Sequence, residues 1–333
     1  MTGIHHVTAI SSDPAATVRF YGDTLGLRLV KQTVNFDDPG TFHLYFGDRT
    51  GAPGSILTFF PFPGGMRGRT GSGQAAVTSF AIPAESVGWW MERLGARGLA
   101  VEAPVGRFDE RVIALRDPDG MLLELVGSAR HAELEGWAQG SVPAEHAIRG
   151  VHGVTLWTDG AATGTEEVLT GLLGFTPAGE DGSTRRFRGD SPLGSVVDLR
   201  RTDGFWRGVG GVGTVHHVAF RAADDARQLD VRTAVEESGL QITPVVDRQY
   251  FKSVYFREPG GVLFEVATDT PGFLWDEAES ELGTSLKLPS WLEAHREEIV
   301  QALPSLESVL EVSHDSDPEP RVKARAQALL QQL

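Results

Sequence analysis

An internal repeat constrains the fold of this chain more than any other feature of its sequence. A stretch with the alternating polarity of a β-strand is followed by an amphipathic helical stretch and by further strands, and this pattern recurs. The four copies are residues 3–63, 76–128, 150–201 and 213–268. The clearest copies predict the order βαβββ. A unit of this size cannot bury both faces of its own sheet, so we expect the copies to pair.

Two pairs of units predict an α+β protein with two domains, each a curved mixed sheet, and C-terminal helices after them. The first two units would form one domain and the last two the other. A polar segment between the second and third units is the expected linker, and the repeat stops after the fourth unit. The predicted division is an N-terminal domain at residues 1–130, a linker at 131–149, a C-terminal domain at 150–270 and a helical extension at 271–333.

Composition limits the partners and the location of the protein. The net charge is −15 and Lys and Arg form no basic run, which argues against a nucleic-acid partner and an anionic membrane surface. No stretch approaches the ~18 apolar residues of a membrane span, and no signal-peptide pattern is present. The absence of cysteine excludes disulfides and thiolate metal sites. We therefore expect a protein of the reducing cytoplasm.

Two pairs of histidines point to a metal site. Four of the ten histidines form HH pairs at the first strands of the first and fourth units. Alignment of the units places one residue of each at an equivalent position, namely His6, Ser79, Gly153 and His217. Glu265 follows on an apolar strand of the fourth unit, where an unpaired carboxylate would be costly to bury. Two imidazoles and one carboxylate with open positions are typical of non-heme Fe(II), with Mn(II) next, and are also known for zinc.

Strand geometry does not decide which histidine of each pair would bind the metal. Neighbouring residues of a strand face opposite sides of the sheet, so His6 shares a face with Thr8 and His5 shares one with Val7. A single histidine in a strand is also more often a hydrogen-bonded core residue than a ligand. The choice within each pair stays open at this point.

The hairpin that carries Glu265 supplies two further candidates. The sequence EPGG at residues 258–261 predicts a tight turn, which places Tyr255 beside Glu265 on the adjacent strand. A phenol at that place could act as an acid, a base or a hydrogen-bond donor. Arg248 precedes this hairpin and could face an anionic substrate.

For four other residues near these strands, a structural role either competes with a functional one or is the expected role. Phe60 could form the wall of a pocket, with core packing as the alternative. His43 and Tyr45 are expected in the core. Glu124 lies in the second unit at the position equivalent to Glu265, but that unit has no histidine pair, so we expect a solvated or paired carboxylate there.

These motifs resemble the vicinal oxygen chelate superfamily of glyoxalases, bleomycin resistance proteins and extradiol dioxygenases, and within it the ring-cleaving dioxygenases that act on hydroquinones. The resemblance extends along the chain and includes GIHHVTAISSD, the strand HHVAF and the segment DRQYFKSVYFREPGGVLFEVATD. It implies three metal ligands, His6, His217 and Glu265. It also implies five residues around the substrate, namely His5, Thr8, His216, Arg248 and Tyr255.

The resemblance implies an Fe(II)-dependent enzyme that uses O₂ to cleave the ring of hydroquinone, a substituted hydroquinone or a related aromatic diol. His216 and Tyr255 are expected to move protons and Arg248 to stabilise negative charge. His5, Thr8 and Phe60 are expected to bind the substrate. The aromatic diol and O₂ are the expected partners, and assembly into a homo-oligomer is compatible with the sequence.

Catechol-cleaving members of this superfamily take their ligands from the third and fourth units, whereas this chain has Gly153 at the ligand position of its third unit. The resemblance therefore requires a site that joins the first and fourth units. Two other functions remain open for the same fold. One is a glyoxalase-like lyase or isomerase, although glyoxalases usually carry four protein ligands. The other is a non-enzymatic binding protein of the antibiotic-resistance kind, which needs no metal.

Overall fold

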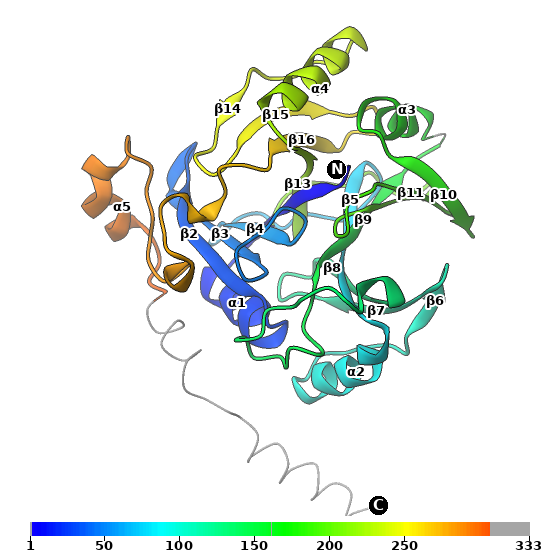
Figure 1. Ribbon diagram of the computed structural model, residues 1–333, viewed down its shortest axis with the longest axis horizontal. Helices are drawn as coiled ribbons and strands as arrows, with labels where there is room; N and C mark the ends of the chain where they lie inside the picture. Colours follow the sequence, from blue (N-terminus) through cyan, green and yellow to red (C-terminus); the bar gives the residue numbers. More distant parts are fainter. Residues whose placement is uncertain (1, 161, 307–333) are drawn as a thin grey trace, which may run out of the picture.

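The computed structural model describes residues 2–160 and 162–306, which form two eight-stranded sheets with helices at the periphery of the molecule (Figure 1). The first unit contains β1 (Ile4–Ser11), α1 (Pro14–Val18), β2 (Arg28–Asn35), β3 (Asp38–Gly47) and β4 (Ile56–Pro61). The second contains β5 (Gln74–Pro83), α2 (Val87–Ala96), β6 (Val105–Arg107), β7 (Glu110–Arg116) and β8 (Leu122–Ser128).

The other two units have the same order of elements. The third unit contains β9 (Gly150–Thr158), α3 (Thr163–Glu167), β10 (Thr176–Asp181), β11 (Thr184–Arg188) and β12 (Val196–Arg201). The fourth contains β13 (Thr214–Ala222), α4 (Asp225–Glu237), β14 (Val246–Asp247), β15 (Lys252–Arg257) and β16 (Leu263–Thr268). The fourfold βαβββ repeat is therefore confirmed.

Each sheet combines two units that lie on opposite sides of the expected linker. The first sheet has the strand order β14-β15-β16-β13-β1-β4-β3-β2 and joins the fourth unit to the first. The second sheet has the order β10-β11-β12-β9-β5-β8-β7-β6 and joins the third unit to the second. This pairing differs from the expected one, which joined the first unit to the second. The strand pattern does not specify a partner, because the first strand of every unit offers the same kind of edge. The domain boundaries themselves stay a prediction.

Both sheets are mixed, as expected. The first strand of each unit runs parallel to the last strand of the same unit, as β1 does to β4 and β13 does to β16. The two units of a sheet meet through an antiparallel pair, β1 with β13 in the first sheet and β5 with β9 in the second. The centre of the first sheet is therefore the place where the two histidine-bearing strands lie side by side.

Local chemistry explains where several elements begin and turn. Asp13 accepts hydrogen bonds from the first backbone N–H groups of α1, and Asp224 does the same for α4, as N-cap residues do. The turn between β15 and β16 closes with a hydrogen bond from the N–H of Gly261 to the carbonyl of Glu258. Gly261 has φ +104°, a conformation that residues with a side chain rarely adopt.

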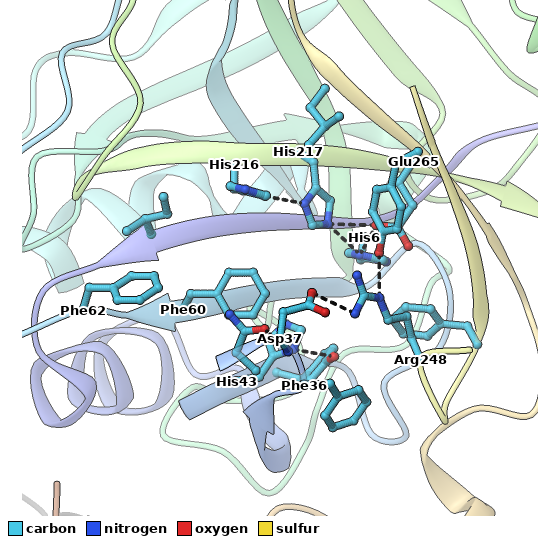
Figure 2. A pocket seen from close by; sticks show the side chains of 16 residues that line it. His6, Phe36, Asp37, His43, Phe60, Phe62, His216, His217, Arg248 and Glu265 are labelled. Carbon is cyan, nitrogen blue, oxygen red and sulfur yellow. Dashed lines mark hydrogen bonds and ion pairs between the residues drawn. The ribbon is translucent and has the colours of Figure 1, made fainter. Parts of the chain in front are cut away.

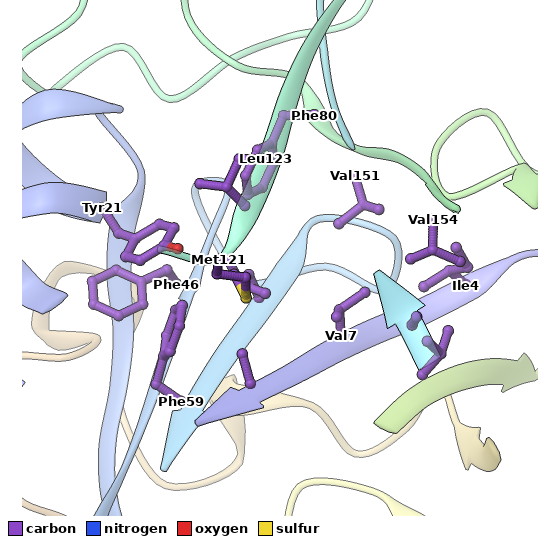
Figure 3. Close-up of a cluster of buried hydrophobic side chains, with 14 of the residues drawn as sticks. Ile4, Val7, Tyr21, Phe46, Phe59, Phe80, Met121, Leu123, Val151 and Val154 are labelled. Carbon is purple, nitrogen blue, oxygen red and sulfur yellow. The ribbon is translucent and has the colours of Figure 1, made fainter. Parts of the chain in front are cut away.

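The main apolar core lies where the two sheets meet (Figure 3). Ile4 and Val7 of β1 and Val151 and Val154 of β9 belong to it, and all four are buried. Burial of one such side chain contributes about 1.5–3 kcal/mol to stability. Because Val7 points into this core, its neighbour His6 points to the other face of the sheet.

A C-terminal segment crosses the edge of the first sheet and contains α5 (Arg296–Ala302). Lys31 of β2 is fully buried beneath it and forms ion pairs with Asp276, at 2.6 Å, and with Glu277. The expected helix in this extension is thus partly confirmed, while the predicted helical stretch after residue 306 lies outside the described residues. Within the described part of the chain, no helix has the length and apolar character to cross a membrane.

Candidate metal centre and its pocket

Two β-bulges bring both histidines of each pair to the same side of the first sheet. The ladder between β1 and β13 changes register at His5 on one strand and at His216 on the other. A bulge adds an unpaired residue and re-aims its side chain. The Nδ1 atoms of His5 and His6 are consequently 2.9 Å apart, and those of His216 and His217 are 2.7 Å apart. The strict alternation of a regular strand does not hold here, so His5 lies beside His6 and His216 lies beside His217.

Three side chains converge at the centre of this sheet (Figure 2). The Oε2 atom of Glu265 lies 2.9 Å from Nε2 of His217 and 3.4 Å from Nε2 of His6. The two Nε2 atoms are 3.4 Å apart, and all three side chains are buried. One potential ligand atom from each residue lies within 4.8 Å of the others.

The carboxylate of Glu265 indicates that this cluster suits a cation. Its Oε1 atom accepts a hydrogen bond from the hydroxyl of Ser253, but its Oε2 atom has no hydrogen bond of acceptable geometry although it is fully buried. Burial alone would raise the pKa of Glu265, but His6 and His217 outweigh it and hold the pKa well below the usual range. An ionised buried oxygen beside two imidazole nitrogens fits a divalent metal ion of the Fe(II), Mn(II) or Zn(II) kind.

The contacts between neighbouring histidines are compatible with one arrangement of ring protons that leaves both Nε2 atoms free to bind a metal. If Nδ1 of His6 and His217 carries the proton, each donates it to Nδ1 of His5 or His216, and both Nε2 lone pairs point toward Glu265. This is the tautomer that a bound metal would require, because all three converging atoms would then be electron donors. In the same assignment His216 carries its own proton on Nε2. Burial lowers the pKa of His216 to about 4, so its ring is neutral near pH 7.

A cavity of about 400 Å³ opens above the three residues. That volume lies within the range of small-molecule pockets. Aromatic side chains from both units of the first sheet form much of its wall, namely Phe36, Phe60, Phe62 and Phe251. The cavity is therefore shaped for a small, largely apolar ring with its polar groups near the histidines.

Tyr255 and Arg248 form the polar side of this cavity. Tyr255 lies opposite Glu265 in the register of β15 and β16, and its phenol oxygen accepts a hydrogen bond of 3.1 Å from Nε of Arg248. Burial raises the pKa of Tyr255 and the charge of Glu265 raises it further, so the phenol stays protonated. Because the oxygen accepts from Arg248, the phenol proton is available to a ligand. Arg248 also donates from Nη1 to Asp37 at 3.1 Å.

The structure brings together most of the residues that the sequence singled out. The cavity is lined by seven of them, His6, His216, His217, Arg248, Tyr255, Glu265 and Phe60. His5 and Thr8 do not line it, in contrast to the expectation that they would touch a substrate. Both are buried behind the wall, His5 against His6 and Thr8 against the hydroxyl of Thr58, from which it accepts a hydrogen bond of 3.0 Å. His5 and Thr8 can therefore affect a ligand only through the residues that they contact.

Tyr45 is buried in an apolar cluster, as expected, but sequence reasoning missed that Tyr45 and His43 also line the cavity. The hydroxyl of Tyr45 lies 2.8 Å from Nδ1 of His43, whose Nε2 lies 2.8 Å from the hydroxyl of Thr58. Burial lowers the pKa of His43 well below its usual value, so the ring is neutral. The alternation in FHLYFG carried a signal, because its two polar-capable residues share one face of β3 and its apolar residues share the other.

The equivalent position of the second sheet holds an ion pair. Glu124 of β8 accepts a hydrogen bond of 2.7 Å from the hydroxyl of Ser79 on β5. Arg107 donates two hydrogen bonds to the same carboxylate, at 2.9 and 2.7 Å. The guanidinium thus neutralises the carboxylate, which agrees with the expected paired state of Glu124.

Comparisons with known proteins place the chain among related sequences. Residues 3–125 match the model of the "Glyoxalase/Bleomycin resistance protein/Dioxygenase superfamily". The chain is 46% identical to "Putative ring-cleaving dioxygenase MhqE" of Bacillus subtilis (strain 168), over 91% of this chain and 99% of that protein. It is 34% identical to "Chlorohydroquinone/hydroquinone 1,2-dioxygenase" of Sphingobium indicum, over 90% of this chain and 95% of that one.

A solved structure is similar along the same length. The crystal structure of a "putative dioxygenase" from Bacillus subtilis subsp. subtilis str. 168 superimposes with a TM-score of 0.87 at 43% identity, covering 91% of this chain and 97% of that one. The repeat, the two mixed sheets and the sequence identity point to the same conclusion. The chain belongs to the glyoxalase/bleomycin resistance protein/dioxygenase superfamily, among its ring-cleaving dioxygenases.

Proposed function

We propose that the chain is an Fe(II)-dependent dioxygenase that uses O₂ to cleave the ring of hydroquinone, a substituted hydroquinone or a related aromatic diol. The observation that carries this proposal is the convergence of His6, His217 and the unpaired oxygen of Glu265 at the base of an aromatic-walled cavity. The activity named for the Sphingobium indicum relative supports the hydroquinone class. Mn(II) is the second choice of metal, because it accepts the same ligands.

Fe(II) held by these three residues would leave coordination positions for a substrate oxygen and O₂ and would supply the electron transfer between them. The remaining roles belong to the protein. Phe60 and the other aromatic side chains hold the ring of the diol and exclude water from it. His43 and Tyr45 continue this wall on β3 with a neutral hydrogen-bonding surface.

Proton transfer and charge stabilisation fall to three side chains that line the cavity. The phenol proton of Tyr255 is free to be donated to a substrate oxygen, because Arg248 already donates to the phenol oxygen. His216 presents its Nε2 proton to the cavity while its Nδ1 orients His217. Arg248 stabilises negative charge that develops on the substrate oxygen. His5 and Thr8 act through their neighbours, His5 by orienting His6 and Thr8 by holding Thr58.

Oxygen consumption tests this proposal directly. Protein loaded anaerobically with Fe(II) would be mixed with hydroquinone, methylhydroquinone, chlorohydroquinone or catechol, and O₂ uptake would be followed with an electrode. We expect uptake of one O₂ for each hydroquinone consumed. No uptake with any of these diols, despite bound iron, would overturn the proposal. Turnover of a substrate without O₂ would instead support a lyase or isomerase.

Matched variants test the metal ligands in the same experiment. Glu265→Gln removes the charge of the carboxylate but keeps its shape, and His217→Ala removes a nitrogen ligand. Both should lose bound iron and O₂ uptake. His295→Ala serves as the control, because His295 lies at the exposed start of α5, away from the cavity. Retention of stoichiometric iron by both ligand variants would show that the three residues are misassigned.

A further inference from the structure

An ion pair between Arg248 and Asp37, two residues that line the cavity, joins the two units of the first sheet. Arg248 is the only Lys or Arg among the described residues that line the cavity. It comes from the segment before β15 in the fourth unit, whereas its partner Asp37 lies in the turn between β2 and β3 of the first unit. Figure 2 shows the side chains of Arg248 and Asp37 joined by this contact. The positive charge that could attract an anionic ligand is therefore already paired.

We propose that Asp37 is a specificity-determining residue, which excludes ring substrates that carry an anionic substituent and leaves the cavity to neutral hydroquinones. This inference rests on the proposed function, because it concerns the substrates of the same site. The histidine pairs and Glu265 do not account for a choice between neutral and anionic substrates, whereas the charge of Asp37 does.

The hydrogen bonds of Arg248 explain how Asp37 acts. Nε of the guanidinium is held by Tyr255, and Nη1 donates to Oδ2 of Asp37 at 3.1 Å. A carboxylate on the ring of a substrate would compete with Asp37 for that guanidinium and would meet a like charge beside it. A neutral substituent such as methyl encounters no such repulsion. Asp37 thus makes the cavity mouth electrically neutral while Arg248 remains in place to assist a substrate oxygen.

The position of Asp37 is set by the fold and not by Arg248 alone. The turn that carries it is anchored by its neighbour Phe36, whose ring packs edge to face against Trp291 at a centroid distance of 5.6 Å. Phe36 also lines the cavity. The side chain of Asp37 is 74% exposed, so its influence on a ligand is screened by salt. A selectivity that depends on this charge should therefore weaken as ionic strength rises.

Two ring substrates of similar size provide the test. 2,5-Dihydroxybenzoate is a hydroquinone that carries a carboxylate, and methylhydroquinone carries a neutral methyl group. The measured quantity is the ratio of kcat/KM for 2,5-dihydroxybenzoate to kcat/KM for methylhydroquinone, with Fe(II)-loaded protein at low and high NaCl. Anaerobic titration of both compounds gives their dissociation constants as a second readout that needs no turnover.

Three variants separate charge from shape. Asp37→Asn should raise the ratio by about 1.5-fold to fivefold at low salt, as expected for one exposed charge near a ligand. Asp37→Glu keeps the charge and should keep the wild-type ratio. Asp38→Asn is the matched control, because Asp38 is the exposed first residue of β3, directly after Asp37, and does not line the cavity. The increase in Asp37→Asn should shrink at high salt.

The outcomes distinguish this inference from the function on which it rests. If the wild type consumes methylhydroquinone but Asp37→Asn leaves the ratio and the dissociation constants unchanged, the inference is overturned and the function stands. An equal rise in Asp38→Asn would also overturn it, because the effect would then come from net charge alone. If neither compound is consumed, the proposed function fails, and the dissociation constants of the variants still decide whether Asp37 repels an anion.

Discussion

Replacement of His5 by phenylalanine should weaken metal binding without altering the wall of the cavity. His5 is buried, does not line the cavity, and lies with its Nδ1 2.9 Å from Nδ1 of His6. Loss of such an outer partner of a metal-binding histidine typically reduces metal affinity by about 10- to 100-fold, because the ligand ring is no longer held in one tautomer and orientation. That range corresponds to about 1.4–2.7 kcal/mol.

Competition with a chelator under anaerobic conditions would measure the dissociation constant of Fe(II) for His5→Phe and for the wild type. At saturating iron, KM for hydroquinone should stay close to the wild-type value, because His5 is separated from the substrate by His6. His216→Phe is the informative partner, since His216 orients His217 in the same way but also lines the cavity. We expect that variant to lose metal affinity and to raise KM as well.

A third variant and a folding control decide whether His5 orients His6. His5→Gln, which offers an amide oxygen as acceptor, should recover part of the lost affinity, and circular dichroism would confirm that each variant is folded. If folded His5→Phe binds Fe(II) as tightly as the wild type does, the contact between the two Nδ1 atoms does not orient His6. The explanation given for the histidine pairs would then be wrong.

Three further predictions concern stability. Saturation with Fe(II) at 100 times its dissociation constant should raise the free energy of unfolding by about 2.7 kcal/mol, a gain that Glu265→Gln should lose in a thermal melt. Arg186 is buried and donates to Asp198, at 2.8 Å from both Nε and Nη2, and to Glu110 at 2.7 Å. Arg186→Ala should therefore cost about 3–5 kcal/mol in urea unfolding, and a loss below about 1 kcal/mol would contradict this. Burial, followed by the charge of His152, lowers the pKa of His131 to about 4. Between about pH 6.5 and pH 4, His131 is therefore protonated in the unfolded chain but not in the folded one. The free energy of unfolding should fall as the pH drops through this range, and it should fall less steeply in His131→Asn.

The sequence was sufficient to predict the repeating unit, because strand alternation and turn residues are local signals. The EPGG turn is an example, since it placed Tyr255 opposite Glu265 as observed. The partners of the units were not predictable in this way. The first strands of all units have similar edges, and the choice between them depends on which apolar faces fit together. Ile4 and Val7 illustrate this, because they pack against a strand of the third unit.

The sequence could predict those site residues whose type is unusual for their position, such as a charged residue on an apolar strand. It could not predict the side chains whose orientation depends on an irregular backbone. Glu265 is conspicuous as a carboxylate on an apolar strand, and it lies beside His6 and His217 as the resemblance implied. The orientation of His5 depends on a bulge, which alternation cannot reveal. Thr8 lies on the expected face, but the hydroxyl of Thr58 covers it. Whether a side chain on the correct face is exposed to the cavity depends on neighbours that are distant in sequence.

The strand order of the first sheet also determines when the metal site can exist during synthesis of the protein. His6 and His217 are separated by 211 positions, and Glu265 follows later still. The second sheet, from β5 to β12, is complete in the nascent chain before β13 has been made. One edge of β1 therefore stays unpaired until the fourth unit has been synthesised. Protease digestion of ribosome-arrested chains should detect this interval. Binding of the proposed iron would accordingly belong to the last stage of folding, and a truncated chain would carry His6 without the other two residues of the cluster.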